Sequence, residues 1–122
     1  MERWRPVKGY ENAYHISDHG RVRSLHKVNP HNGRVWPEAL LKIQLHTKGY
    51  AAVWLGKDNK SRKFFVHRLV AIAFIVNPEA KDYVNHINKE RLHNHVDNLE
   101  WLTHEENMHH RDNYQPDNDE PF

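Results

Sequence analysis

Apolar residues occur in this chain in short runs, which polar and turn-forming residues interrupt. The longest uninterrupted run, from Leu69 to Val76, has only eight residues. A helix needs roughly 20 such residues to cross a bilayer. None of the apolar runs is therefore long enough to cross a bilayer. The 122 residues therefore predict one small domain, or a small domain with an attached module.

Alternating segments bounded by turn formers predict short strands at residues 14–17, 21–25, 41–45, 50–55 and 62–66. In the second of these, Arg21 and Arg23 share one face. In the third, Leu41, Ile43 and Leu45 share one face. Residues 26–39 are expected to form a loop that exposes basic groups.

One helical stripe follows, formed by Leu69, Ile72, Ala73 and Val76, and Asn77-Pro78 is expected to end it. The C-terminal part predicts a strand at 83–87, a polar loop, a strand near 99–102 and a helix to about residue 111. A capping box, Thr103 with Glu106, starts that helix. The predicted fold class is α+β, with a small antiparallel β module followed by this ββα unit.

The chain contains no cysteine. This excludes a disulfide framework, a thiolate metal site and a thiol nucleophile. No signal-peptide pattern opens the sequence. We therefore expect a soluble intracellular protein with no membrane partner.

Charge is distributed unevenly along the chain. Residues 1–68 carry 14 Lys and Arg against 5 Asp and Glu, whereas residues 69–122 carry 4 against 11. Such halves suit a basic part that meets a polyanion. An ordinary solvated surface would also account for them.

Histidine is concentrated in one segment, since six of the 12 histidines lie within residues 86–110. Imidazole is both a metal ligand and a proton carrier near neutral pH. A strand packed on a helix can bring His86 and Asn107 to one phosphate. There His86 would act as the base and the Asn107 amide oxygen would bind a divalent ion. Asn98 would hold the intervening loop through backbone hydrogen bonds.

A resemblance to a known family is carried by three stretches of residues 82–110. They read Asp82-Tyr83-Val84-Asn85-His86-Ile87, then Asn94-His95-Val96-Asp97-Asn98-Leu99-Glu100-Trp101-Leu102-Thr103, then Glu106-Asn107-Met108-His109-His110. These stretches resemble the HNH endonucleases of the His-Me finger (ββα-metal) superfamily, most of all the phage and intron-homing type.

A second resemblance lies at the N-terminus, in Trp4-x-Pro6-x-x-Gly9-Tyr10 and Gly20-Arg21-Val22-Arg23-Ser24-Leu25. These residues resemble the NUMOD4 module, a DNA-binding element attached to such nucleases. The two resemblances imply a NUMOD4-like basic DNA-binding module at residues 1–45 and an HNH nuclease domain at 46–112. An acidic disordered tail is expected at 113–122.

Carried over by position, the resemblance assigns the general base to His86, the loop-ordering asparagine to Asn98 and the helix-borne metal ligand to Asn107. In this family the residue before the base is often an aspartate that also binds metal, whereas here, as in many relatives with Val-Asn-His, it is Asn85. Asn85 either ligates through its amide oxygen or leaves Asn107 to hold the ion nearly alone. The implied cofactor is Mg²⁺ or another divalent cation such as Mn²⁺.

The expected DNA contacts are Arg21, Arg23, Arg34, Lys63, Arg68 and His110. Such cations bind the phosphate backbone without reading bases. Arg68 could instead clamp the cleaved phosphate or simply solvate its helix. His110 shares a helix face with Asn107, and an ordinary surface histidine is the equal alternative.

Together these features predict a metal-dependent endonuclease that nicks or cleaves double-stranded DNA, as a monomer or homodimer. If the chain is phage-encoded, it would work in the host cell cytoplasm. Two alternatives stay open: a catalytically silent DNA-binding module, and a nonspecific nuclease that also cuts RNA.

Overall fold

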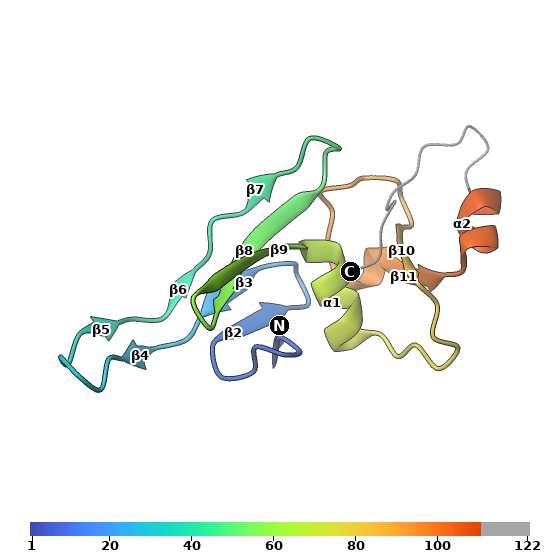
Figure 1. The fold of residues 1–122 in the computed structure, drawn as a ribbon. Coiled ribbons are helices and arrows are strands. Elements are labelled where there is room, and N and C mark those ends of the chain that lie inside the picture. Colours follow the sequence, from blue (N-terminus) through green and yellow to red (C-terminus); the bar gives the residue numbers. More distant parts are fainter. Residues whose placement is uncertain (111–122) are drawn as a thin grey trace.

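The computed structural model describes the backbone of residues 1–110 and the side chains of residues 1–108. Figure 1 shows sheets in the N-terminal part and a hairpin between two helices in the C-terminal part. The architecture is sheet-rich α+β, which confirms the predicted fold class. The predicted tail at 113–122 lies outside the described residues.

The first sheet is antiparallel and four-stranded, in the order β1 (Trp4–Pro6), β2 (Tyr14–Ser17), β3 (Val22–Ser24) and β6 (Ala39–Leu40). Its two central strands confirm the strands expected at residues 14–17 and 21–25, and the Asp18–Gly20 turn joins them. Ile16 and Val22 are paired across these strands and are buried. This face of the sheet therefore packs into the core.

A projecting hairpin replaces the loop expected at residues 26–39. β4 (Lys27–Val28) pairs antiparallel with β5 (Val35–Trp36), and Figure 1 shows the pair reaching away from the rest of the protein. The turn residues that predicted a loop close this hairpin, because the Asn29 carbonyl accepts from Gly33 N at 2.9 Å. Residues 27–36 are called the arm below.

The second sheet contains β7 (Gln44–Leu45), β8 (Ala51–Lys57) and β9 (Lys60–Phe65), joined as the predicted meander. The single strand expected at 41–45 is wrong. Leu40 is the last residue of β6, which belongs to the first sheet, whereas β7 belongs to the second sheet. The residues between Leu40 and β7 connect the two sheets. Ile43 and Leu45 are consequently exposed, whereas Leu41 packs against the core.

Helix α1 (Val66–Phe74) follows β9 without a loop. Its buried stripe begins with Val66, Leu69 and Val70, whereas Ile72 and Val76 are exposed. The predicted buried stripe is therefore right for Leu69 and wrong for Ile72 and Val76. Because every residue from 69 to 76 is apolar, periodicity alone does not mark the inner face.

The ββα unit has the predicted order. β10 (Tyr83–His86) pairs antiparallel with β11 (Leu99–Leu102), which follows the short 3₁₀ helix η1 (Val96–Asn98), and α2 (His104–His110) comes last. The capping box is confirmed. Thr103 N donates to Glu106 Oε1 at 2.9 Å and Glu106 N donates to Thr103 Oγ1 at 3.1 Å.

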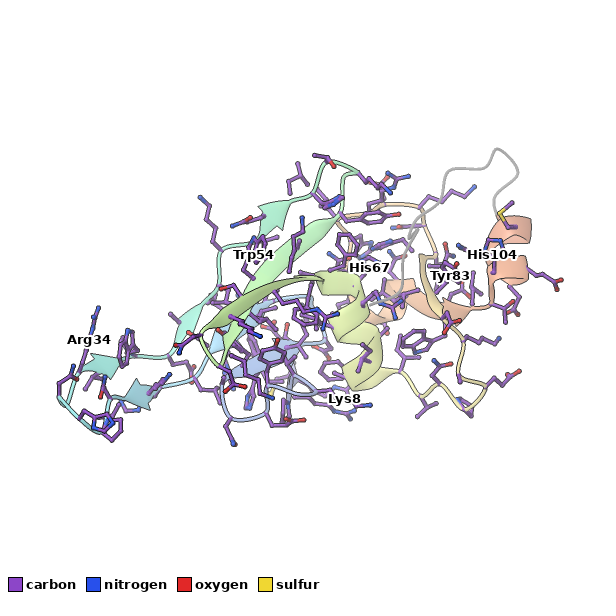
Figure 2. All side chains as sticks on the ribbon, viewed as in Figure 1. Lys8, Arg34, Trp54, His67, Tyr83 and His104 are labelled. Atoms are coloured by element: carbon purple, nitrogen blue, oxygen red, sulfur yellow. The ribbon has the colours of Figure 1, made fainter. Side chains whose placement is uncertain are left out.

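The hairpin β10–β11 lies between the two helices, and both helices contact both of its strands. On the α1 side, Trp101 Nε1 donates to the carbonyl of Ile75 at 3.0 Å. On the α2 side, the Tyr83 and His104 rings lie 5.6 Å apart. Figure 2 labels both side chains.

One hydrophobic core runs through both halves of the chain. It joins Ile16 and Val22 of the first sheet to Val53 of β8, Val70 of α1 and Val84 of β10. The division into modules at residue 45 stays a prediction. In the described part of the chain, none of the helices has the length and apolar character of a membrane span.

Candidate active site

His86 ends β10 and is fully buried. Its Nε2 lies 2.7 Å from Oδ1 of Asn94, in the loop that joins the hairpin strands. Because an amide oxygen only accepts hydrogen bonds, this contact places the ring proton on Nε2. In the neutral ring the basic lone pair is then on Nδ1, as a general base requires.

A second imidazole lies beside the base candidate. The rings of His67 and His86 are 4.8 Å apart, and His67 also stacks on Tyr50 at 5.1 Å. His67 comes from α1 and lies inside the protein, as Figure 2 shows. Burial, aided by the nearby His86 and Arg68, lowers the pKa of His67 well below its ordinary value. His67 is therefore a neutral neighbour.

Asn94 was missed by sequence reasoning, and so was its contact with the Asp18–Gly20 turn. A Cβ on Gly20 would lie 2.8 Å from Asn94 Cβ, and Gly20 has a φ of +87°. Val96 N donates to the Asp18 carbonyl at 2.8 Å. The first sheet thus braces the loop that holds His86, and only the turn glycine hinted at this in the sequence.

Asn98 makes the hydrogen bonds expected of a loop-ordering residue. Its Nδ2 donates to the His93 carbonyl at 2.9 Å, and its Oδ1 accepts from Asn88 N at 3.1 Å. These bonds span the polar loop after His86. Asn98 therefore orders the loop, and its side chain has little capacity left for a metal.

Two buried amide oxygens have no hydrogen-bond partner. Asn85 is 0% exposed and Asn107 is 2% exposed, and the Oδ1 of each lacks a donor. Leaving such an atom unsatisfied costs about 1–3 kcal/mol. Neutral hard oxygens suit Mg²⁺, which keeps several of its waters. The donor chemistry at Asn85 and Asn107 therefore fits the divalent ion that the resemblance implies.

Strand alternation assigns these side chains to different faces of β10. Asn85 shares a face with Tyr83, which α2 contacts through His104. His86 shares a face with Val84 and touches α1 through His67. The ligand candidates thus belong to the α2 side and the base to the α1 side of one strand end. The approach of His86 and Asn107 to a shared phosphate stays a prediction.

The predicted DNA contacts differ in their surroundings. Arg21 is exposed, and its guanidinium donates a hydrogen bond to the Glu2 carboxylate. Arg23 is half-buried, and its guanidinium lies 4.3 Å from the centre of the Trp4 ring. Both contact the Trp4 ring, as their predicted shared face requires. Arg34 is exposed on the arm, over Trp36 at 5.0 Å. Figure 2 shows it far from the body of the protein.

Lys63 is half-buried on β9 and lies over the exposed Trp54 ring. Arg68 needs a correction, because it is only 5% exposed. Its Nη1 donates to the Asp82 carbonyl at 2.8 Å and its guanidinium lies over Trp101. It braces the hairpin against α1, which disfavours contact with the DNA backbone. The side chain of His110 lies outside the described residues.

No group of three or more His, Cys, Asp or Glu side chains within the described residues could hold a metal. The amide oxygens of Asn85 and Asn107 are donors of another kind, because asparagine is neutral and is not one of those four residue types.

Comparison with known proteins shows which proteins this chain is similar to. A NUMOD4 motif matches residues 2–56. The rest of the chain extends the similarity, so this is a relative of the HNH endonucleases that carries a NUMOD4 motif. The resemblance predicted from the sequence is confirmed.

Particular relatives are viral and phage proteins. The chain is 37% identical over 110 residues to the uncharacterized HNH endonuclease L245 of Acanthamoeba polyphaga mimivirus, covering 90% of this chain and 30% of that protein. It is 35% identical over 105 residues to the DNA endonuclease I-HmuI of Bacillus phage SP01, covering 86% of this chain and 55% of that protein.

A solved structure of the HNH homing endonuclease I-HmuI, described as showing DNA binding and cleavage, has the same fold. The TM-score is 0.71 at 34% identity, covering 88% of this chain and 56% of that one. The chain thus spans between about a third and just over half of the length of these relatives.

Proposed function

We propose that this chain is a metal-dependent DNA endonuclease. Its relatives are named HNH endonucleases, and the similar solved structure is one of DNA binding and cleavage by such an enzyme. The observation that carries the proposal is the pair of buried amide oxygens without donors, on Asn85 and Asn107. They belong to the same ββα unit as His86, whose proton is fixed on Nε2 by Asn94.

His86 would act as the general base. Its Nδ1 would take a proton from a water molecule, whose oxygen then attacks the phosphorus while the bond to O3′ breaks, and solvent water would protonate the leaving O3′. The products would carry a 5′-phosphate and a 3′-hydroxyl. Asn94 keeps the ring in the required tautomer, and Asn98 keeps the loop that presents Asn94 in place.

Asn107 and Asn85 would hold the divalent ion, Mg²⁺ or Mn²⁺, through Oδ1. When bound, the ion would stabilise the negative charge that develops on the phosphate and the leaving oxygen. Both residues are rigidly placed, Asn107 on a capped helix and Asn85 within a paired strand.

Duplex DNA would be held by exposed cations, including Arg34 on the arm, which lies far from the body of the protein. A two-stranded hairpin is an element that a DNA groove can accept. With one site per chain, a monomer would nick one strand, and a homodimer could cut both.

A plasmid relaxation assay tests the proposal. With Mg²⁺, the wild-type chain should convert supercoiled DNA to the nicked form, and chelation should abolish the reaction. His86→Ala and Asn107→Ala should both lose activity, whereas Glu105→Gln, an exposed change on the same helix, should not. Equal cutting by His86→Ala and wild type would sink the proposal, and binding without cutting would favour a silent DNA-binding module. Parallel digestion of RNA tests for a nonspecific nuclease.

A further inference from the structure

We infer that Glu100 is a positioning residue that turns the Asn85 amide oxygen toward the divalent ion and supplies the charge that this ligand lacks. The inference deepens the proposed function and rests on it. It starts from the neutral side chain of Asn85, at a position where the family often has a charged aspartate.

The contact between the two side chains is direct. Asn85 and Glu100 are paired across β10 and β11, so their side chains leave the same face of the hairpin. Asn85 Nδ2 donates to Glu100 Oε2 at 3.0 Å. A carboxylate only accepts hydrogen bonds, so Glu100 selects the amide orientation with nitrogen toward itself. The oxygen must then point the other way.

That oxygen is the atom left without a donor. Asn85 is 0% exposed, and its Oδ1 has no hydrogen-bond partner. Without Glu100, the amide could rotate and present its nitrogen, which cannot bind a cation. Glu100 thus decides which end of Asn85 faces the proposed ion.

Charge gives Glu100 a second role. Asn85 and Asn107 are both neutral, whereas an aspartate at position 85 would carry a full charge. A carboxylate bonded to the far side of a ligand orients that ligand and raises its basicity. Glu100 is only half-buried, so its carboxyl group reaches the protein surface. Asn85 and Glu100 together therefore take the place of one liganding aspartate.

The test measures metal affinity directly, using the full chain and Mn²⁺ alone. Electron paramagnetic resonance of free Mn²⁺ gives the dissociation constant, and Mg²⁺ titration of plasmid nicking gives a second value. Loss of a supporting residue of this kind weakens metal binding by about 10- to 100-fold. Glu100→Gln should show a loss of that size, and Glu105→Gln, the matched control, should not.

The double variant Asn85→Asp/Glu100→Gln separates this role from a structural one. It restores the charge at the ligand itself and removes the need to orient an amide, so it should recover most of the lost affinity. A merely structural glutamate would not be rescued this way. Melting temperatures establish that each variant is folded.

Three results would overturn the inference. If wild type binds Mn²⁺ and nicks DNA, and Glu100→Gln does both equally well, Glu100 has no such role while the proposed function stands. Glu100 also lacks this role, and the proposed function still stands, if Glu100→Gln loses affinity for Mn²⁺ and the double variant recovers none of it. If wild type neither binds Mn²⁺ nor nicks DNA, the proposed function fails and this inference fails with it.

Discussion

His67 is an imidazole that folding removes completely from water. Neither ring nitrogen has a hydrogen-bond partner, and burial lowers its pKa well below the ordinary value of 6.5. Below pH 6.5 the His67 imidazole binds a proton in the unfolded chain but stays neutral in the folded chain. The contribution of His67 to the free energy of unfolding is therefore greatest above pH 6.5 and decreases as the pH falls toward the pKa of His67 in the folded state.

His67→Phe should remove this part of the pH dependence, because phenylalanine keeps a ring and does not titrate. Urea unfolding between about pH 7.5 and about pH 5 should show a shallower decline for the variant than for wild type, by at most about 1.4 kcal/mol per pH unit. Parallel declines for the two proteins would show that His67 is already protonated in the fold.

Asn94 fixes the tautomer of His86, so its acceptor oxygen should matter more than its size. Asn94→Leu should lower the rate constant for nicking by up to the roughly 10²- to 10⁴-fold that a positioned base contributes. Asn94→Asp, which keeps an acceptor, should retain more activity. Single-turnover kinetics with saturating DNA measures both, and equal rates for Leu and Asp would contradict the assignment.

Sequence reasoning at this scale found side chains whose place follows from chain order. His86, Asn98 and Asn107 lie at family spacing within one ββα unit, and Asn98 has the expected loop contacts. It missed Asn94 and Glu100, because their importance comes from one contact each across the fold. No local pattern marks such residues.

At the scale of elements, the Asp18–Gly20 turn connects the first sheet to the loop beside His86. Gly20→Ala should place a Cβ against Asn94. Gly9→Ala is a matched control, because Gly9 also has a positive φ, +86°, but no atom lies within 4 Å of a Cβ added there. Both should lose roughly 1–2 kcal/mol of stability from the left-handed backbone. Only Gly20→Ala should also slow nicking under conditions where the protein is fully folded. Equal rates for the two would disprove the coupling.

Two elements could not be placed from local patterns. The alternation at 41–45 is real, but the chain crosses between sheets there, so its pattern fits neither sheet fully. In α1, the continuous apolar run from residue 69 onward gives no periodic pattern from which the buried face could be predicted. The capping box of α2, by contrast, was predictable because both partners lie within one turn.

At the scale of the whole molecule, the arm carries basic groups away from the core, and this shape suits contact with a long polyanion. Arg34→Gln should weaken DNA binding about equally for unrelated sequences and lower the slope of log affinity against log salt by about 1. Arg21→Gln should change the slope less, because Glu2 already neutralises that guanidinium. Fluorescence anisotropy across a salt series compares them, and an unchanged slope for Arg34→Gln would rule out a phosphate contact there.

The overall organisation was predictable from motifs, since the NUMOD4 match and the similarity to HNH endonucleases follow the expected order. The continuous core was not, because Ile16 and Val84 meet only in the folded protein. The basic N-terminal part is thus packed against the site it would serve.

The central claim is that Asn85 and Asn107 share one divalent ion beside His86. Crystals soaked in Mn²⁺ and measured at the manganese absorption edge test it most directly, because anomalous scattering locates the ion itself. We predict one strong peak in contact with Oδ1 of both asparagines. A manganese peak bound elsewhere, for instance by His93 or His95, with none between the two amides, would contradict the account.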